Sequence, residues 1–226
     1  MLTGRGHQAW QGQEYYRYLL WALAGLLVIY PMMADWFLGR LIEQLGTFGV
    51  LVTGILAIYK NRPQIAFTLV TATIALLLGL VHLLRTEILG LTIAWLVSGL
   101  VFFTSVTWVL ARDIFTSRGG ATSALLYGAV SVYLLIGLNF ANVHFLLETA
   151  APGSYNCGST QCEFAYQMPA YVYFSFVTLT TMGYSDITPA TRIAGVLSYM
   201  EAITGQMYVA ILMARLVGMH ISQSER

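Results

Sequence analysis

Long apolar stretches dominate the chain, and short polar segments separate them. Six of these stretches are long enough to cross a membrane, and they cover residues 18–37, 42–59, 65–84, 88–111, 121–147 and 193–218. The hydrocarbon core of a bilayer is about 30 Å thick, so a helix of roughly 20 apolar residues spans it. The pattern therefore predicts an all-α membrane protein with six transmembrane helices.

A seventh apolar stretch, residues 171–181, lies between the fifth and sixth spans and is too short to cross a bilayer. It follows Pro169, and proline is favoured in the first turn of a helix. Irregular backbone at membrane depth persists only where it packs in protein or lines a water-filled path. We therefore expect a re-entrant helix that leads into non-helical backbone.

Composition supports a membrane protein and excludes several functions. The chain is 58% hydrophobic and 9% charged, whereas soluble domains contain roughly a quarter charged residues. The net charge of +1 does not favour a nucleic-acid partner. No serine–histidine–acid or cysteine–histidine arrangement and no phosphate-binding loop is found, so we predict neither an enzyme nor a cofactor.

The distribution of basic residues predicts the orientation, because cytoplasmic loops are enriched in lysine and arginine. With both termini in the cytoplasm, eight of the 11 basic residues lie inside, namely Arg5, Arg17, Lys60, Arg62, Arg112, Arg118, Arg215 and Arg226. The re-entrant helix then enters from outside. No signal-peptide pattern is seen, so we expect the first span to be retained. Short loops favour a prokaryotic inner membrane.

The predicted organisation has two membrane halves. It consists of a cytoplasmic N-terminal segment (1–17), a four-helix domain (18–112), a linker (113–120), a pore domain (121–218) and a cytoplasmic tail (219–226). A voltage sensor requires several arginines within the membrane, but residues 88–111 of the fourth span contain no Arg or Lys. We therefore expect a four-helix domain that does not sense voltage.

The most informative stretch, residues 178–189, reads TLTTMGYSDITP. A cation that crosses a membrane loses its water, and backbone carbonyl oxygens can replace it. Glycine supplies the backbone angles that aim successive carbonyls at one axis. We predict carbonyl rings from Thr181, Met182, Gly183 and Tyr184, with the Thr181 hydroxyl at the inner end. One chain has one such segment, so closing the rings requires a homotetramer.

This stretch resembles the selectivity filter of the tetrameric potassium-channel superfamily, whose pattern is threonine, an apolar residue, glycine, tyrosine, glycine and aspartate. Five of the six positions match, and Thr180 fits the paired threonines of that family. Residues 200–218 resemble the inner helix of its prokaryotic six-span members. The resemblance implies a passive potassium channel of four copies in a lipid bilayer, with potassium at residues 181–184.

Ser185 departs from this pattern, because it replaces the second glycine and makes the filter a GYS variant. A serine at positive φ costs on the order of 1 kcal/mol, and at another angle it would turn its carbonyl away. We expect the outermost ring to be affected first and the preference for potassium to survive. A weakly selective monovalent cation channel is the alternative.

Several residues near the filter are candidates for its support. Asp186 either attracts cations or anchors the filter through Tyr171 or Tyr173, unless Arg192 neutralises it. Glu201 lies inside the sixth span, where a carboxylate is costly, and we predict that it forms a polar clasp behind the filter.

The inner helix leaves two interpretations of one glycine. Gly205 falls where the family often places a gating hinge, but small residues also serve close helix packing in membranes. Helical spacing from Gly205 places Gln206, Val209 and Met213 on the side of a cavity below the filter.

Cys157 and Cys162 lie in the predicted outer loop, where thiols can oxidise. We predict a disulfide that stiffens this loop, with two free thiols as the alternative. Histidines 82, 144 and 220 are expected to be interfacial or packed.

Two other functions remain to be weighed. A transporter with related loops would place four pore segments in one chain, and an accessory membrane protein would need no ordered filter.

Overall fold

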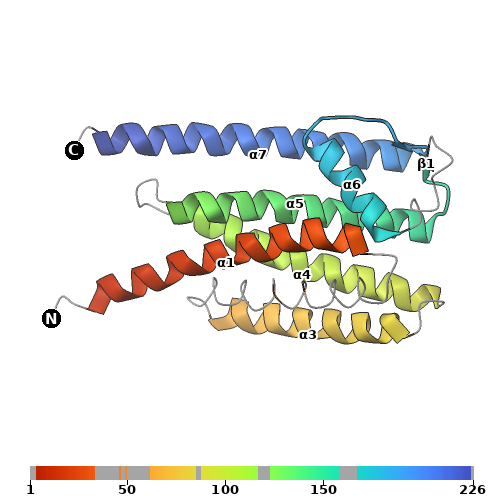
Figure 1. Ribbon diagram of the computed structural model, residues 1–226, viewed down its shortest axis with the longest axis horizontal. Coiled ribbons are helices and arrows are strands. Elements are labelled where there is room, and N and C mark those ends of the chain that lie inside the picture. Colours follow the sequence, from red (N-terminus) through yellow and green to blue (C-terminus); the bar gives the residue numbers. More distant parts are fainter. Residues whose placement is uncertain are drawn as a thin grey trace.

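The computed structural model describes residues 4–33, 46, 49, 62–84, 88–116, 123–157 and 167–224. These residues form α1 (Gly4–Met33), α3 (Arg62–Leu84), α4 (Leu89–Thr116), α5 (Ser123–Ala150), β1 (Tyr155–Cys157), α6 (Met168–Leu179), β2 (Ile187–Pro189) and α7 (Arg192–Ser224). The long helices run side by side along the longest axis, and the short helix α6 is inclined to them (Figure 1).

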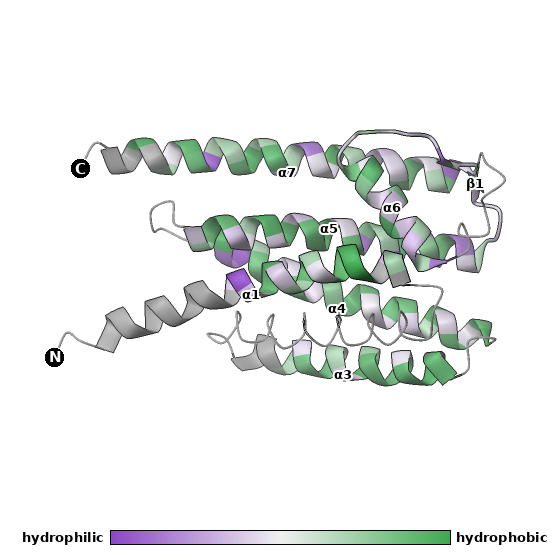
Figure 2. Ribbon diagram, in the orientation of Figure 1, coloured by the Kyte–Doolittle hydropathy of each residue, from purple (hydrophilic) through white to green (hydrophobic). Residues whose placement is uncertain are grey.

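Four of the described helices are long and apolar enough to cross a membrane: Ala66–Leu84, Leu89–Thr116, Ser123–Ala150 and Arg192–Met219. Hydrophobic residues predominate along these helices (Figure 2). Within α1, Tyr16–Ile29 is a shorter apolar stretch among the residues that the structure describes. The second predicted span, 42–59, lies outside the described residues apart from two positions. The fold is thus that of a mostly helical membrane protein, and six spans stay a prediction.

Several helices extend beyond the predicted spans; α4, for example, continues to Thr116, inside the predicted linker. α1 already begins at Gly4, inside the predicted N-terminal segment, and α7 continues to Ser224, inside the predicted tail. Hydropathy marks where a helix leaves the bilayer, whereas a helix ends where its backbone is interrupted. Pro31 lies in the last turn of α1, and it has no N–H to donate to the carbonyl four residues earlier.

Helix α5 is the centre of the molecule and packs against α1, α4, α6 and α7. In its most apolar stretch 56% of residues are buried, compared with 11% in α7. Close approach of α6 depends on Gly137, because a Cβ atom there would lie 2.6 Å from the Phe176 ring. The pore half of the chain is thus built around α5, while α7 is left largely bare.

A polar clasp joins α4 to α5. The Asn139 amide donates hydrogen bonds to Thr107 Oγ1 at 3.0 Å and to the Leu135 carbonyl at 2.8 Å. The Thr104 hydroxyl donates to Asn139 Oδ1 at 2.8 Å. Hydrogen bonds between membrane helices contribute about 0.6 kcal/mol each. This Asn139 clasp fixes α4 to the α5 of its own chain.

The outer loop reaches the segment that follows the filter motif. β1 and β2 pair antiparallel, with Asn156 opposite Thr188. The Glu148 carboxylate at the end of α5 accepts hydrogen bonds from the backbone N–H groups of Gly153 and Tyr155, at 2.8 and 3.1 Å. Cys157 is disulfide-bonded, and Cys162 lies outside the described residues, so their pairing stays a prediction.

Candidate functional site

Helix α6 begins and ends as a re-entrant helix requires. It follows an extended residue, Gln167, and has proline in its first turn. At its end the Thr180 N–H donates to the Phe176 carbonyl at 3.1 Å, and the Met182 N–H donates to the Val177 carbonyl at 2.9 Å. Residues 182–185 then have no regular secondary structure. The negative end of the α6 dipole therefore lies at the start of the filter motif.

The backbone of the filter motif alternates in handedness. Thr181, Gly183 and Ser185 have φ values of 59°, 63° and 65°, whereas Met182 and Tyr184 between them do not have positive φ. An extended strand points successive carbonyls to opposite sides, but alternation between left- and right-handed residues points them to the same side. The alternation at residues 181–185 is thus the backbone pattern that the predicted carbonyl rings require.

Ser185 adopts the left-handed conformation that the family's glycine would take. This conformation costs a residue with a Cβ atom about 1–2 kcal/mol. The Ser185 hydroxyl donates a hydrogen bond to the Gly183 carbonyl at 3.3 Å. The serine thus keeps the alternation, but its side chain contacts a carbonyl that belongs to the filter.

Asp186 is anchored by α6. The Tyr173 hydroxyl donates to Asp186 Oδ2 at 2.5 Å, and this hydrogen bond raises the pKa of Tyr173 to about 12. The other predicted partner, Tyr171, is buried, and its ring packs 5.5 Å from the Tyr155 ring. Of the two tyrosines, Tyr173 therefore makes the tether between helix and filter.

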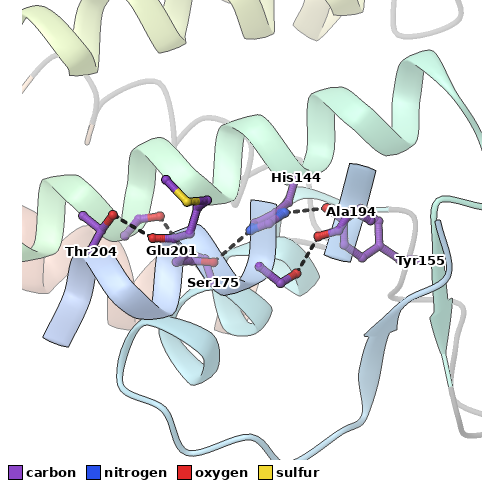
Figure 3. A network of polar contacts seen from close by, with 9 residues as sticks. His144, Tyr155, Ser175, Ala194, Glu201 and Thr204 are labelled. Carbon is purple, nitrogen blue, oxygen red and sulfur yellow. Dashed lines mark hydrogen bonds and ion pairs between the residues drawn. The ribbon is translucent and has the colours of Figure 1, made fainter. Parts of the chain in front are cut away.

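A buried polar network lies behind α6 (Figure 3). Glu201 of α7 is fully buried and places Oε2 2.8 Å from His144 Nε2 of α5. The Ser175 hydroxyl of α6 donates to the other carboxylate oxygen. His144 Nδ1 lies 2.5 Å from the Tyr155 hydroxyl of β1. Four elements of the pore half are thus joined through the Glu201 network, which consists of Glu201, His144, Ser175 and Tyr155.

Sequence reasoning identified Glu201 but assigned no role to Ser175 or Tyr155, and it treated His144 as a packed or interfacial residue. His144 is indeed fully buried, but it links Glu201 to Tyr155. Burial raises the pKa of Tyr155 above its ordinary value, and the Glu201 and Glu148 carboxylates add to this shift. The signal in the sequence that pointed to such a network was the Glu201 carboxylate inside an apolar span, because a buried charge requires partners.

Gly205 allows α7 to approach the end of α6. A Cβ atom at this position would lie 2.3 Å from the Leu179 carbonyl oxygen and 2.9 Å from Leu179 Cδ1. The next residue, Gln206, donates from Nε2 to Thr181 Oγ1 at 3.1 Å. Helix α7 thus packs closely on α6 at Gly205, and the hinge stays a prediction. Val209 and Met213 lie further along α7 and are exposed in the single chain.

One face of the motif is exposed in a single chain. Residues 180–186 are all exposed, with Met182 at 58% and Tyr184 at 59%. Behind them lies a crevice of about 160 Å³, lined by Tyr173, Val177 and Ser198 among others.

Residues 122–221 match a protein-family model described as an ion channel. The matched region contains α5, the outer loop, α6, the filter motif and most of α7. No curated protein and no solved structure shows significant similarity to the chain. The matched family is one of ion channels, and the four apolar helices indicate a membrane protein.

Proposed function

We propose that four copies of this chain form a potassium-selective channel that conducts passively down the ion gradient. The observation that carries the proposal is the alternation of positive φ at Thr181, Gly183 and Ser185, which we expect to turn the carbonyls of residues 181–185 to one side. Four such strands around an axis would surround a dehydrated cation with oxygen ligands.

Potassium would bind at the carbonyls of Thr181, Met182, Gly183 and Tyr184, with the Thr181 hydroxyl at the inner end. The C-terminal end of α6 adds a negative partial charge below these rings. Ser185 would supply the outermost ring, supported by Thr180 and by the Tyr173–Asp186 hydrogen bond. Potassium is the permeant ligand, and no cofactor is required.

The tetramer is supported by the surfaces that one chain leaves bare. The most apolar stretch of α7 is only 11% buried, and Ile203, Ile211 and Val217 are each about half exposed. Three further copies and lipid would cover them. The channel would lie in a prokaryotic cell membrane with both termini in the cytoplasm, following the excess of inner Lys and Arg.

We further propose that voltage does not drive opening. Residues 88–111 contain no Arg or Lys, so moving α4 would carry little charge across the membrane field. The Asn139 clasp also holds α4 to α5. The gating stimulus is therefore to be sought elsewhere.

A weakly selective cation channel is the second candidate, and one observation favours it. The Ser185 hydroxyl donates to the Gly183 carbonyl at 3.3 Å, so it competes with a permeant ion for the same oxygen. If this competition dominates, sodium and potassium would permeate to similar extents.

Reconstituted liposomes provide the test. Purified protein should form cross-linkable tetramers and pass potassium faster than sodium, with block by barium. Gly183→Ala is the matched control, because alanine at this positive φ is strained, and it should abolish flux in an intact tetramer. Equal flux rates for potassium and sodium would favour the second candidate. An absence of any flux would refute both.

A further inference from the structure

We propose that Gln206 is a positioning residue for the innermost ion site, where its amide fixes the hydroxyl of Thr181. The inference rests on the proposed channel function and adds a residue outside the filter motif. Its basis is the hydrogen bond from Gln206 Nε2 to Thr181 Oγ1 at 3.1 Å, which joins α7 to the first residue of the filter.

The contact depends on how closely α7 lies to the end of α6. Gly205 has no side chain, and any Cβ atom there would meet the Leu179 carbonyl oxygen at 2.3 Å. The absence of that atom brings the following residue within reach of Thr181. Gly205 and Gln206 thus act in sequence, because the first permits the approach and the second uses it.

The hydrogen-bonding capacity of Thr181 determines what this contact does. A threonine hydroxyl has one proton to donate and two lone pairs to accept with. The proton is directed to the Thr180 carbonyl, at 2.7 Å from Thr181 Oγ1. One lone pair receives the Gln206 amide. A single lone pair is left, and it is the one that a cation can use.

The amide therefore preorganises the ion ligand. Without the Gln206 amide, the Thr181 side chain and its hydroxyl can again adopt other staggered rotamers, of which there are about three per torsion. Only part of that population would direct a lone pair to the ion. Four subunits contribute to one site, so we expect binding at the innermost site to weaken by about 3- to 10-fold when the amide is removed.

The experiment measures block by barium applied from the cytoplasmic side of channels in planar bilayers. Gln206→Met keeps the length of the side chain and removes the donor. Gln206→Asn keeps the amide but is one methylene shorter, so it also loses the contact and serves if the methionine variant does not fold. Both should raise the barium dissociation constant by about 3- to 10-fold. Met207→Leu, at the next position of α7, should not change it.

A double-mutant cycle separates positioning from packing. Thr181→Val removes the hydroxyl, so Gln206→Met should have no further effect on barium block in that background. The proposal is overturned if barium blocks the single Gln206 variants as strongly as the wild type. It is also overturned if Gln206→Met has the same effect with and without the Thr181 hydroxyl. A wild-type protein that carries no potassium current would overturn the proposed function itself, and this inference with it.

Discussion

The filter motif is supported in two different ways, behind it and at its ends. Behind it, the Glu201 network is buried and joins four elements. At the ends, single hydrogen bonds from Gln206 and Tyr173 reach the exposed residues Thr181 and Asp186. Breaking a buried polar contact leaves unsatisfied groups, whereas water replaces an exposed one. The network should therefore determine whether the pore half folds, and the exposed bonds how it selects ions.

Among the variants that test this difference, we expect the largest loss of stability from Glu201→Ala. It leaves the buried His144 Nε2 without its carboxylate partner, whereas Ser175 keeps the Gly137 carbonyl as an acceptor, and breaking a buried pair costs about 3–5 kcal/mol. We expect this variant to lose the tetramer on heating, as measured by size-exclusion chromatography of heated samples. Glu201→Gln keeps the shape and two polar ends, so it should be clearly milder. Equal, small effects of the two variants would contradict the assigned role of the network.

Gly205→Ala tests the close approach of α7 to α6. The new methyl group would meet the Leu179 carbonyl oxygen, and overpacking of this kind costs about 1–3 kcal/mol. We expect a lower midpoint of thermal unfolding together with a loss of current.

The matched control is Gly195→Ala, on the same helix, where a Cβ atom would meet nothing within 4 Å. It should be neutral or slightly stabilising, because alanine favours a helix over glycine. If Gly205→Ala were as stable as this control yet failed to open, a hinge and not packing would be the function of Gly205.

Ser185→Gly and Ser185→Ala test what supports the outer end of the filter motif. Glycine removes both the left-handed strain, about 1 kcal/mol, and the hydroxyl. Alanine removes the hydroxyl alone. If the hydroxyl competes with potassium at Gly183, both variants should raise the permeability ratio of potassium to sodium in bi-ionic recordings. An increase with glycine only would show that strain is the cause, and no change in either would remove Ser185 from the selectivity mechanism.

Tyr173→Phe should have the smallest effect on stability, about 0.5 kcal/mol, yet lower selectivity by releasing Asp186. The measurement is the same permeability ratio, with Tyr199→Phe as a control on an exposed tyrosine of α7. Because the hydrogen bond raises the pKa of Tyr173 to about 12, the tether persists at and below pH 10 and is lost as the pH rises through 12. Selectivity that changes between pH 6 and 9 would argue against this tether.

The sequence predicted the helices and the pore loop because both signals are local. Hydropathy averaged over a span shows where a helix crosses the membrane, and the residues from Thr180 to Asp186 are contiguous. The Glu201 network could not be predicted in the same way. Its four members come from β1 and three helices, and their meeting depends on the register between α5 and α7, which hydropathy does not contain.

Ser185 and Gly205 are two single residues whose conformation or packing the sequence alone could not decide. For Ser185 the sequence allowed either a strained backbone or a displaced carbonyl, and only the φ value of 65° distinguishes them. For Gly205 it allowed a hinge or close packing, and the distance to Leu179 shows that α7 packs closely on α6 there, while the hinge stays a prediction. In both cases the answer depends on a backbone position fixed by neighbours that are distant in sequence.

The Asn139 clasp bears on the order in which a subunit is made. Because Thr104, Thr107 and Asn139 belong to one chain, the interface between α4 and α5 can form while that chain is still alone in the bilayer. Copies would then meet as finished units, through α7 and the pore loop, the surfaces that remain bare. Association would join folded subunits side by side, with no exchange of peripheral helices between neighbours.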